Sequence, residues 1–194
     1  RNVQNTFNAI TVDSDASTSD TLLLFATGAA KSMVPTSVDD PVLKDFELAL
    51  QSVMLNLAKQ IVCDGEGAQK LIQVDVTGAT SKKSAHKIGL AIANSPLVKT
   101  AIAGGDANWG RVVMAVGKSG EKANSNSISV CFGKTTIAEK GAVVEGYNEA
   151  PVAEHLQGRK IHLAVDVGLG NGKSTVWTCD LTHGYIDINA DYRS

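Results

Sequence analysis

The chain has 194 residues, a formal net charge of −2, 43% hydrophobic residues and 20% charged residues. This composition suits a globular domain and excludes disordered and collagen-like classes. The 18 basic and 20 acidic residues include no dense run of Lys and Arg, so the electrostatic footprint of a nucleic-acid partner is missing. The longest apolar stretch, Leu22 to Ala30, is interrupted by Thr27 and Gly28 and is far shorter than the roughly 20 residues of a membrane span. We therefore expect a soluble protein with no nucleic-acid and no membrane partner.

The N-terminal third predicts two short strands followed by one long helix. Phe7 to Val12 and Thr21 to Ala26 read as strands on either side of the polar loop Asp13 to Asp20. From Ser37 the apolar spacing changes to three or four residues, and two aspartates precede Pro41 at a helix start. The apolar positions of this helix are Leu43, Phe46, Leu50, Val53, Leu57 and Ile61.

The rest of the chain mixes strands and helices without strict alternation. A helix is expected over Ser84 to Ala93, ended by Pro96, and a shorter one over Glu149 to Leu156. Strands are expected at Lys70 to Val76, Val112 to Val116, Ser127 to Phe132, Thr135 to Ala138, Lys160 to Val167 and Ser174 to Cys179. Gly133-Lys134 is typical of a tight hairpin. These elements favour the α+β class, and the lack of a linker favours one domain over residues 1–194.

Cysteine and histidine patterns give no sign of a disulfide framework or a metal site. Cys63, Cys131 and Cys179 are odd in number and never form a C-x-x-C pair, which favours a reducing cytoplasm. The four histidines show no i, i+4 pairing. Because the chain begins at Arg1 without Met or a signal segment, we expect a fragment or processed product.

Gly168 to Thr175 invites a phosphate-loop interpretation, because glycine amides precede Lys173 and Ser174. However, Val167 stands where that motif needs glycine, and β-branched residues rather than a helix follow. A hairpin turn between two strands is therefore favoured.

Three other segments could bind a ligand or merely form turns. Glu66 lies between two glycines after the long helix, where backbone can approach a small ligand closely, although a solvated turn fits equally well. Gly104 to Arg111 packs three glycines, Asp106, an Asn, a Trp and Arg111 into eight positions. It is either a binding loop or a turn that an Asp-Arg pair holds together. The loop Asp13 to Asp20 is favoured as a polar connection over a hydroxyl-rich ligand loop.

The last 18 residues predict a docked end rather than a frayed tail. Their apolar and aromatic content is provided by Tyr185, Ile186, Ile188 and Tyr192. Docking would carry Asn189, Arg193 and Ser194 into the structure.

Four ordered stretches resemble the ornithine acetyltransferase family of arginine biosynthesis, also called glutamate N-acetyltransferase. They are Phe7 to Thr21, Asp64 to Ala68, Ser95 to Arg111 and Trp177 to Ser194. The resemblance implies a precursor that cuts itself into two chains and exposes a Thr nucleophile at the start of the second. It also implies a layered α/β/β/α sandwich.

By this resemblance the chain looks like the second, beta chain, beginning downstream of the nucleophile. Thr6, Thr11, Thr18 and Thr21 do not match the family's cleavage context, so no catalytic residue is assigned here and the nucleophilic Thr is expected upstream of Arg1. The oxyanion hole is implied to lie in the first, alpha chain. We accordingly expect this chain alone to be inactive.

The resemblance carries over Glu66, Asn189 and Ser194 as substrate-binding residues. A carboxylate suits the ammonium of ornithine, and an amide with a hydroxyl suits an amino-acid head group. One departure is Ala107, where the family often has Pro.

The implied reaction moves the acetyl group of N2-acetylornithine to glutamate through an acyl-threonine. The implied partner is the alpha chain, in an assembly of two alpha and two beta chains. No metal or cofactor is implied, apart from acetyl-CoA as a donor if the enzyme is bifunctional. The alternatives are a related N-terminal-nucleophile amidohydrolase or aminopeptidase, and a non-catalytic structural subunit.

Overall fold

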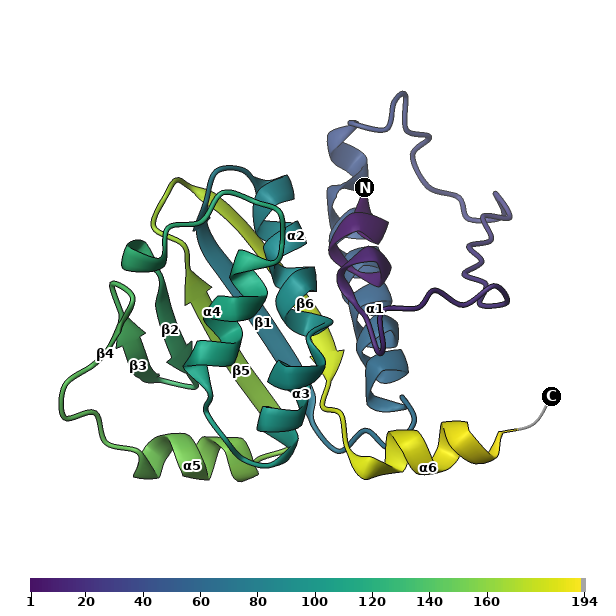
Figure 1. The fold of residues 1–194 in the computed structure, drawn as a ribbon. Helices are drawn as coiled ribbons and strands as arrows, with labels where there is room; N and C mark the ends of the chain where they lie inside the picture. Colours follow the sequence, from purple (N-terminus) through teal and green to yellow (C-terminus); the bar gives the residue numbers. More distant parts are fainter. Residues whose placement is uncertain (193–194) are drawn as a thin grey trace.

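The centre of the computed structural model, which describes residues 1–192, is a six-stranded sheet in the order β4-β3-β2-β5-β1-β6 (Figure 1). Among these described strands, only β1 and β5 pair in parallel; every other neighbouring pair is antiparallel. The strands are β1 (Leu71–Ala79), β2 (Ser129–Phe132), β3 (Thr135–Glu139), β4 (Ala142–Val143), β5 (Lys160–Asp166) and β6 (Gly172–Cys179).

Three helices cover one face of this sheet: α2 (Lys82–Ala93), α3 (Pro96–Ala103) and α4 (Trp109–Gly117) (Figure 1). Alternate side chains of β1, including Ile72 and Val74, are buried in one cluster with Ile88 of α2. A Cβ added at Gly89 of α2 would lie 2.9 Å from Val176 Cγ2, so the helix packs very closely on the sheet. A further helix, α5 (Ala150–Gln157), lies at one end of the sheet.

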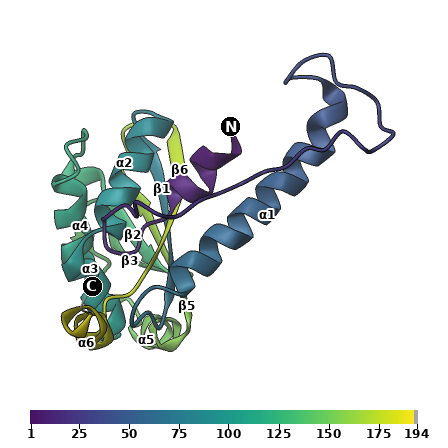
Figure 2. The same cartoon turned by 90° about the vertical axis from the view of Figure 1, so that its right-hand side faces the viewer.

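The long helix α1 (Lys44–Cys63) lies at the β6 side and projects away from the sheet (Figure 2). A turn of 3-10 helix, Pro41–Leu43, leads directly into α1, and the Asp40 carboxylate caps that turn by accepting the amide of Val42 at 3.1 Å. One side of α1 is buried at Met54, Ala58 and Val62, whereas its opposite side is exposed. None of the described helices combines the length and the apolar character that a membrane crossing needs.

The two strands expected near the N-terminus are not formed. Phe7–Ala9 is a turn of 3-10 helix, and Ile10 makes only an isolated bridge with Trp177. Residues 21–26 form an exposed coil. An apolar run cannot become a strand without a neighbour to take its backbone hydrogen bonds, and no other strand runs beside this one within residues 1–192.

The strand expected at Val112–Val116 is instead part of helix α4. Asn108 caps this helix, because its Oδ1 accepts the amide of Arg111 at 3.1 Å. Val112, Ala115 and Val116 then share one buried helical face. Pro96, expected to end the preceding helix, begins α3 at a position where its missing N–H costs nothing.

The glycine-rich segment after β5 is not a hairpin turn, because β1 lies between β5 and β6. The segment crosses the end of β1, where the amides of Leu169 and Gly170 both donate to the Gly78 carbonyl, at 2.7 and 2.8 Å. A Cβ at Gly170 would lie 2.7 Å from the Ala79 carbonyl oxygen, so the crossing requires glycine. Close backbone crossing therefore explains these glycines without a phosphate. The tight hairpin at Gly133-Lys134 is confirmed by the register of β2 and β3.

The α+β class is confirmed, since one mixed sheet carries separate helices and hairpins. A sheet with a helical layer on one face is consistent with one half of an α/β/β/α sandwich.

Candidate functional site

Glu66 lies on the turn between α1 and β1, and its side chain is exposed. The next residue, Gly67, has φ +69°, and a Cβ there would lie 2.5 Å from the Tyr185 amide nitrogen and 2.6 Å from the Gly184 carbonyl carbon. Only glycine fits this position. The close backbone approach expected from the sequence exists, and the segment that approaches is the start of α6 (His183–Asp191).

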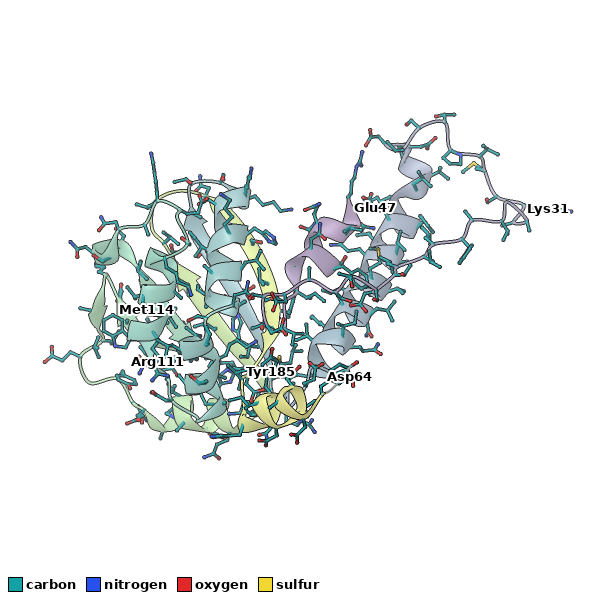
Figure 3. The ribbon with its side chains drawn as sticks, turned by 45° about the vertical axis from the view of Figure 1, so that its right-hand side comes forward. Lys31, Glu47, Asp64, Arg111, Met114 and Tyr185 are labelled. Carbon is teal, nitrogen blue, oxygen red and sulfur yellow. The ribbon has the colours of Figure 1, made fainter. Side chains whose placement is uncertain are left out.

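Three segments that are distant in sequence meet at the first turn of α6. Thr182 caps this helix and donates a hydrogen bond to the Gly67 carbonyl at 2.7 Å. The Tyr185 hydroxyl donates to Asp13 Oδ2 at 2.9 Å, which joins α6 to the loop 13–20. In Figure 3, Tyr185 and Asp64 lie in the same part of the molecule, near the end of α1, and both are far from Lys31. The hydrogen bond to Asp13, followed by burial and nearby carboxylates, raises the pKa of Tyr185.

Beyond its first turn, α6 does not pack on the rest of the chain. It has no buried residue, and Ile186, Ile188 and Tyr192 are all exposed, Tyr192 by 77%. The expectation that these side chains dock the C-terminal end is therefore wrong for the described residues. Apolar content alone does not create the surface against which a helix could bury.

The structure places Asn189 on the exposed part of α6, where its Nδ2 donates to the Tyr185 carbonyl at 3.0 Å. Glu66 and Asn189 thus belong to two elements that touch at Gly67 and Gly184, and no hydrogen bond joins their side chains within residues 1–192. Ser194 lies outside the described residues. The assignment of all three as substrate-binding residues stays a prediction.

Behind the Glu66 turn lies a buried lysine that the sequence analysis missed. Lys99 of α3 is 3% exposed, and its ammonium donates to the Val12 carbonyl. Its Nζ also lies 3.3 Å from Thr178 Oγ1 and 4.0 Å from Cys179 Sγ. Burial lowers the pKa of Lys99 and raises the pKa of Cys179. Recognising the helix that begins at Pro96 would have placed this lysine among apolar residues on the buried side.

Asp180 closes the same cluster and is 2% exposed. Its Oδ1 accepts the amides of Gln69 and Lys70, at 2.8 and 2.9 Å, while its buried Oδ2 has no partner among the described residues. The carboxylate therefore fixes the exit of the Glu66 turn. A buried oxygen without a partner lowers the stability of the fold, so the fold accepts a cost in order to keep a carboxylate at position 180.

A second polar network lies on the sheet face opposite α2 and α4. Asp75 Oδ2 is 2.6 Å from His162 Nε2, and Asp75 also accepts from Thr175 at 2.6 Å and from Gln73 at 2.9 Å. Burial by itself would raise the pKa of Asp75, but the hydrogen bonds and the nearby imidazole outweigh it and lower that pKa. Sequence reasoning could not pair these residues, because 87 positions separate Asp75 from His162.

The segment Gly104 to Arg111 forms a connection between α3 and α4. Asn108 donates to Asp106 Oδ2 at 3.0 Å, and Arg111 Nη1 donates to the Leu97 carbonyl at 2.9 Å. The Asp-Arg pair expected to hold this turn is not formed among the described residues, because Arg111 bonds the Leu97 carbonyl and Asp106 accepts from Asn108. Nowhere in residues 1–192 do three His, Cys, Asp or Glu side chains gather in a way that could hold a metal ion.

The fold of this chain is similar to that of a solved structure. The fold matches the crystal structure of Arginine biosynthesis bifunctional protein argJ from Bacillus halodurans with a TM-score of 0.93, at 40% sequence identity, over 98% of this chain and 89% of that chain. An α+β fold of the arginine biosynthesis ArgJ type is therefore established. The chain matches the ArgJ family over residues 1–194 and belongs to it.

Curated relatives agree with this family. The chain is 63% identical over 188 residues to the Arginine biosynthesis bifunctional protein ArgJ of Gluconobacter oxydans, covering 97% of this chain and 44% of the relative. It is 55% identical over 197 residues to the protein of the same name from Brucella suis, covering 100% of this chain and 48% of the relative. The chain thus spans less than half the length of these curated relatives.

Proposed function

We propose that this chain supplies the substrate-binding part of an acetyltransferase that moves the acetyl group of N2-acetylornithine to glutamate, giving N-acetylglutamate and ornithine. The observation that carries the proposal is the exposed Glu66 carboxylate, presented beside α6 in a chain of the ArgJ family. The relatives' names place them in arginine biosynthesis. The proposed location is the cytoplasm.

In the proposed mechanism the acetyl group passes first to an N-terminal Thr that is not among residues 1–194, which releases ornithine, and then from that Thr to the amine of glutamate, which frees the Thr hydroxyl. A Thr hydroxyl is a weak nucleophile and needs a base, which its own α-amine can provide. Hydrogen-bond donors of a partner alpha chain form the oxyanion hole for the tetrahedral intermediates. The assembly is two alpha and two beta chains, and this chain alone is inactive.

Within this chain, Glu66 binds the ammonium group of ornithine, because a charge-assisted hydrogen bond to a carboxylate is stronger than a neutral one. Asn189 and Ser194 bind the amino-acid head group. Acetyl-CoA is proposed as a second acetyl donor, which fits the word bifunctional in the relatives' names. No other cofactor is required by this chemistry.

The test measures acetylglutamate formation by the assembled enzyme, expressed from the complete coding region. Glu66→Gln should raise the KM for acetylornithine, since losing a hydrogen bond to a charged group costs about 1.5–3 kcal/mol. Asp64→Asn is the matched control, because it removes an exposed carboxylate two residues earlier on the same turn. Its KM should stay at the wild-type value.

Two results would overturn the proposal. Release of free acetate at the same rate with and without glutamate would identify an amidohydrolase instead of a transferase. Wild-type kinetics in Glu66→Gln would leave Glu66 as an ordinary exposed turn residue.

A further inference from the structure

Lys99 is a charged side chain placed where an apolar one would be cheaper. It is 3% exposed, and no carboxylate forms an ion pair with it in the described part of the chain. Its polar neighbours are a carbonyl, a hydroxyl and a thiol. Burying a cation without a paired anion is unfavourable, and replacing it by an apolar residue is often neutral or stabilising. Fold stability alone therefore does not account for a lysine here.

Two of the residues that Lys99 contacts, Val12 and Cys179, pack against the Glu66 turn. A Cβ added at Gly65 would lie 3.0 Å from Val12 Cγ1 and 3.4 Å from Cys179 Sγ, so the turn packs directly on both residues. Val12 and Cys179 come from opposite ends of the chain and have no ladder pairing with each other. The ammonium group of Lys99 is a polar contact that both residues share.

The same lysine is connected to α6 through the loop that follows Val12. Asp13 accepts the Tyr185 hydroxyl at 2.9 Å, and Tyr185 lies in the first turn of α6, which contacts Gly67. A shift of Val12 would therefore move Asp13 relative to α6, and it would also move the side chain on which Gly65 packs. Both consequences change the position of Glu66.

We propose that Lys99 is a positioning residue for the Glu66 turn: by holding Val12 against the end of β6, it sets the height and orientation at which Glu66 faces the substrate. This inference rests on the proposed function, in which Glu66 binds the ornithine side of the substrate. Burial lowers the pKa of Lys99, although Cys179, Asp13 and Asp180 oppose this shift, so the ammonium is kept here at a cost that the fold does not require.

Lys99→Met in the assembled enzyme tests the proposal, because Met fills similar volume without the ammonium. Hydrogen exchange measured by mass spectrometry should become roughly tenfold faster in residues 10–20 and 64–70, since these segments lose a tether. The KM for acetylornithine should rise roughly tenfold to a hundredfold while kcat changes less, because misplacing a binding group by about 1 Å has effects of that order. The control is Lys87→Met, which removes the ion pair between Lys87 of α2 and Glu121. It should change neither measurement.

A double variant separates positioning from a general loss of structure. If Lys99 acts through Glu66, then Glu66→Gln combined with Lys99→Met should raise KM no further than the larger single effect. Independent effects would multiply, and that outcome would overturn the proposal. Unchanged exchange in residues 64–70 would also overturn it.

Folding failure is handled by a second variant. Lys99→Gln keeps a polar donor but is one atom shorter, so it should show the same exchange and KM changes. If both Lys99 variants prevent assembly of the enzyme, Lys99 is a folding residue and the proposal is wrong. If the wild-type enzyme transfers no acetyl group, the proposed function fails, whereas the exchange measurement still decides whether Lys99 holds the turn.

Discussion

Helices α1 and α2 are both amphipathic in sequence, but they differ in how far their apolar side chains are buried. Ile88 and Ile92 of α2 are fully buried against the sheet, whereas Phe46 and Val53 of α1 are more than half exposed. The segment before α1 extends this contrast, because Phe25 is 82% exposed. Periodicity therefore predicts that a helix forms, but only the presence of a facing surface decides whether its apolar side is buried. An apolar area left exposed in this way is typical of interaction surfaces.

The largest expected effect lies in the covered sheet. Phe132 is buried in the cluster beneath α2 and α4, so Phe132→Ala should lower the free energy of unfolding by about 3–5 kcal/mol. Urea denaturation of the protein measures this value. A loss below about 1 kcal/mol would mean that the covered face is no better packed than the exposed face of α1.

Gly67→Ala tests the close backbone contact between the Glu66 turn and the start of α6. Its expected cost is about 1–3 kcal/mol, because both backbone strain and a collision with Tyr185 arise. Gly28→Ala is the control, since Gly28 has the same φ of +69° but nothing within 4 Å of an added Cβ. The difference between the two variants isolates the collision. Equal effects would show that α6 moves aside without cost.

A smaller effect is expected from the network on the other sheet face. The pKa of Asp75 is lowered in the folded protein, so Asp75 stabilises the fold above its unfolded value of about 3.8 and this contribution is lost as pH falls further. Asp75→Asn should flatten the loss of stability below that pH. Thermal unfolding between pH 2 and 6 measures it, with Asp64→Asn as the exposed control. Equal acid sensitivity in Asp75→Asn and the wild type would contradict it.

Sequence reasoning predicted the long periodic elements of the fold and the short hairpin of β2 and β3, but failed on two other short apolar runs. The helix α1 and strands β1 and β5 were predicted because their patterns extend over many residues. Residues 21–26 and Val112–Val116 are too short to distinguish strand, helix and coil by pattern. Their outcomes depended on a missing neighbour strand and on the Asn108 cap, respectively.

Only those candidate residues that lie within a recognisable local motif could be proposed from the sequence. Glu66 was identified from its glycine-flanked turn and the family resemblance, whereas Lys99 required knowledge of tertiary packing. The order of β5, β1 and β6 in the sheet could not be predicted from the sequence either, because contacts between residues distant in sequence decide which strands are neighbours. Local pattern therefore predicts which residues are available, and the fold decides which of them meet.

The smallest expected effect lies in the exposed segment before α1. Phe25→Ser removes an aromatic side chain as large as that of Phe132, but Phe25 buries little surface, so the free energy of unfolding should change by no more than about 0.5 kcal/mol. The same urea denaturation compares both variants directly. A loss approaching that of Phe132→Ala would mean that Phe25 is covered in the protein under the conditions measured. In that case another surface would cover Phe25 during the denaturation measurement, although it is exposed in the structure. The contrast with Phe132 would then come from that covering surface and not from how the segment before α1 folds.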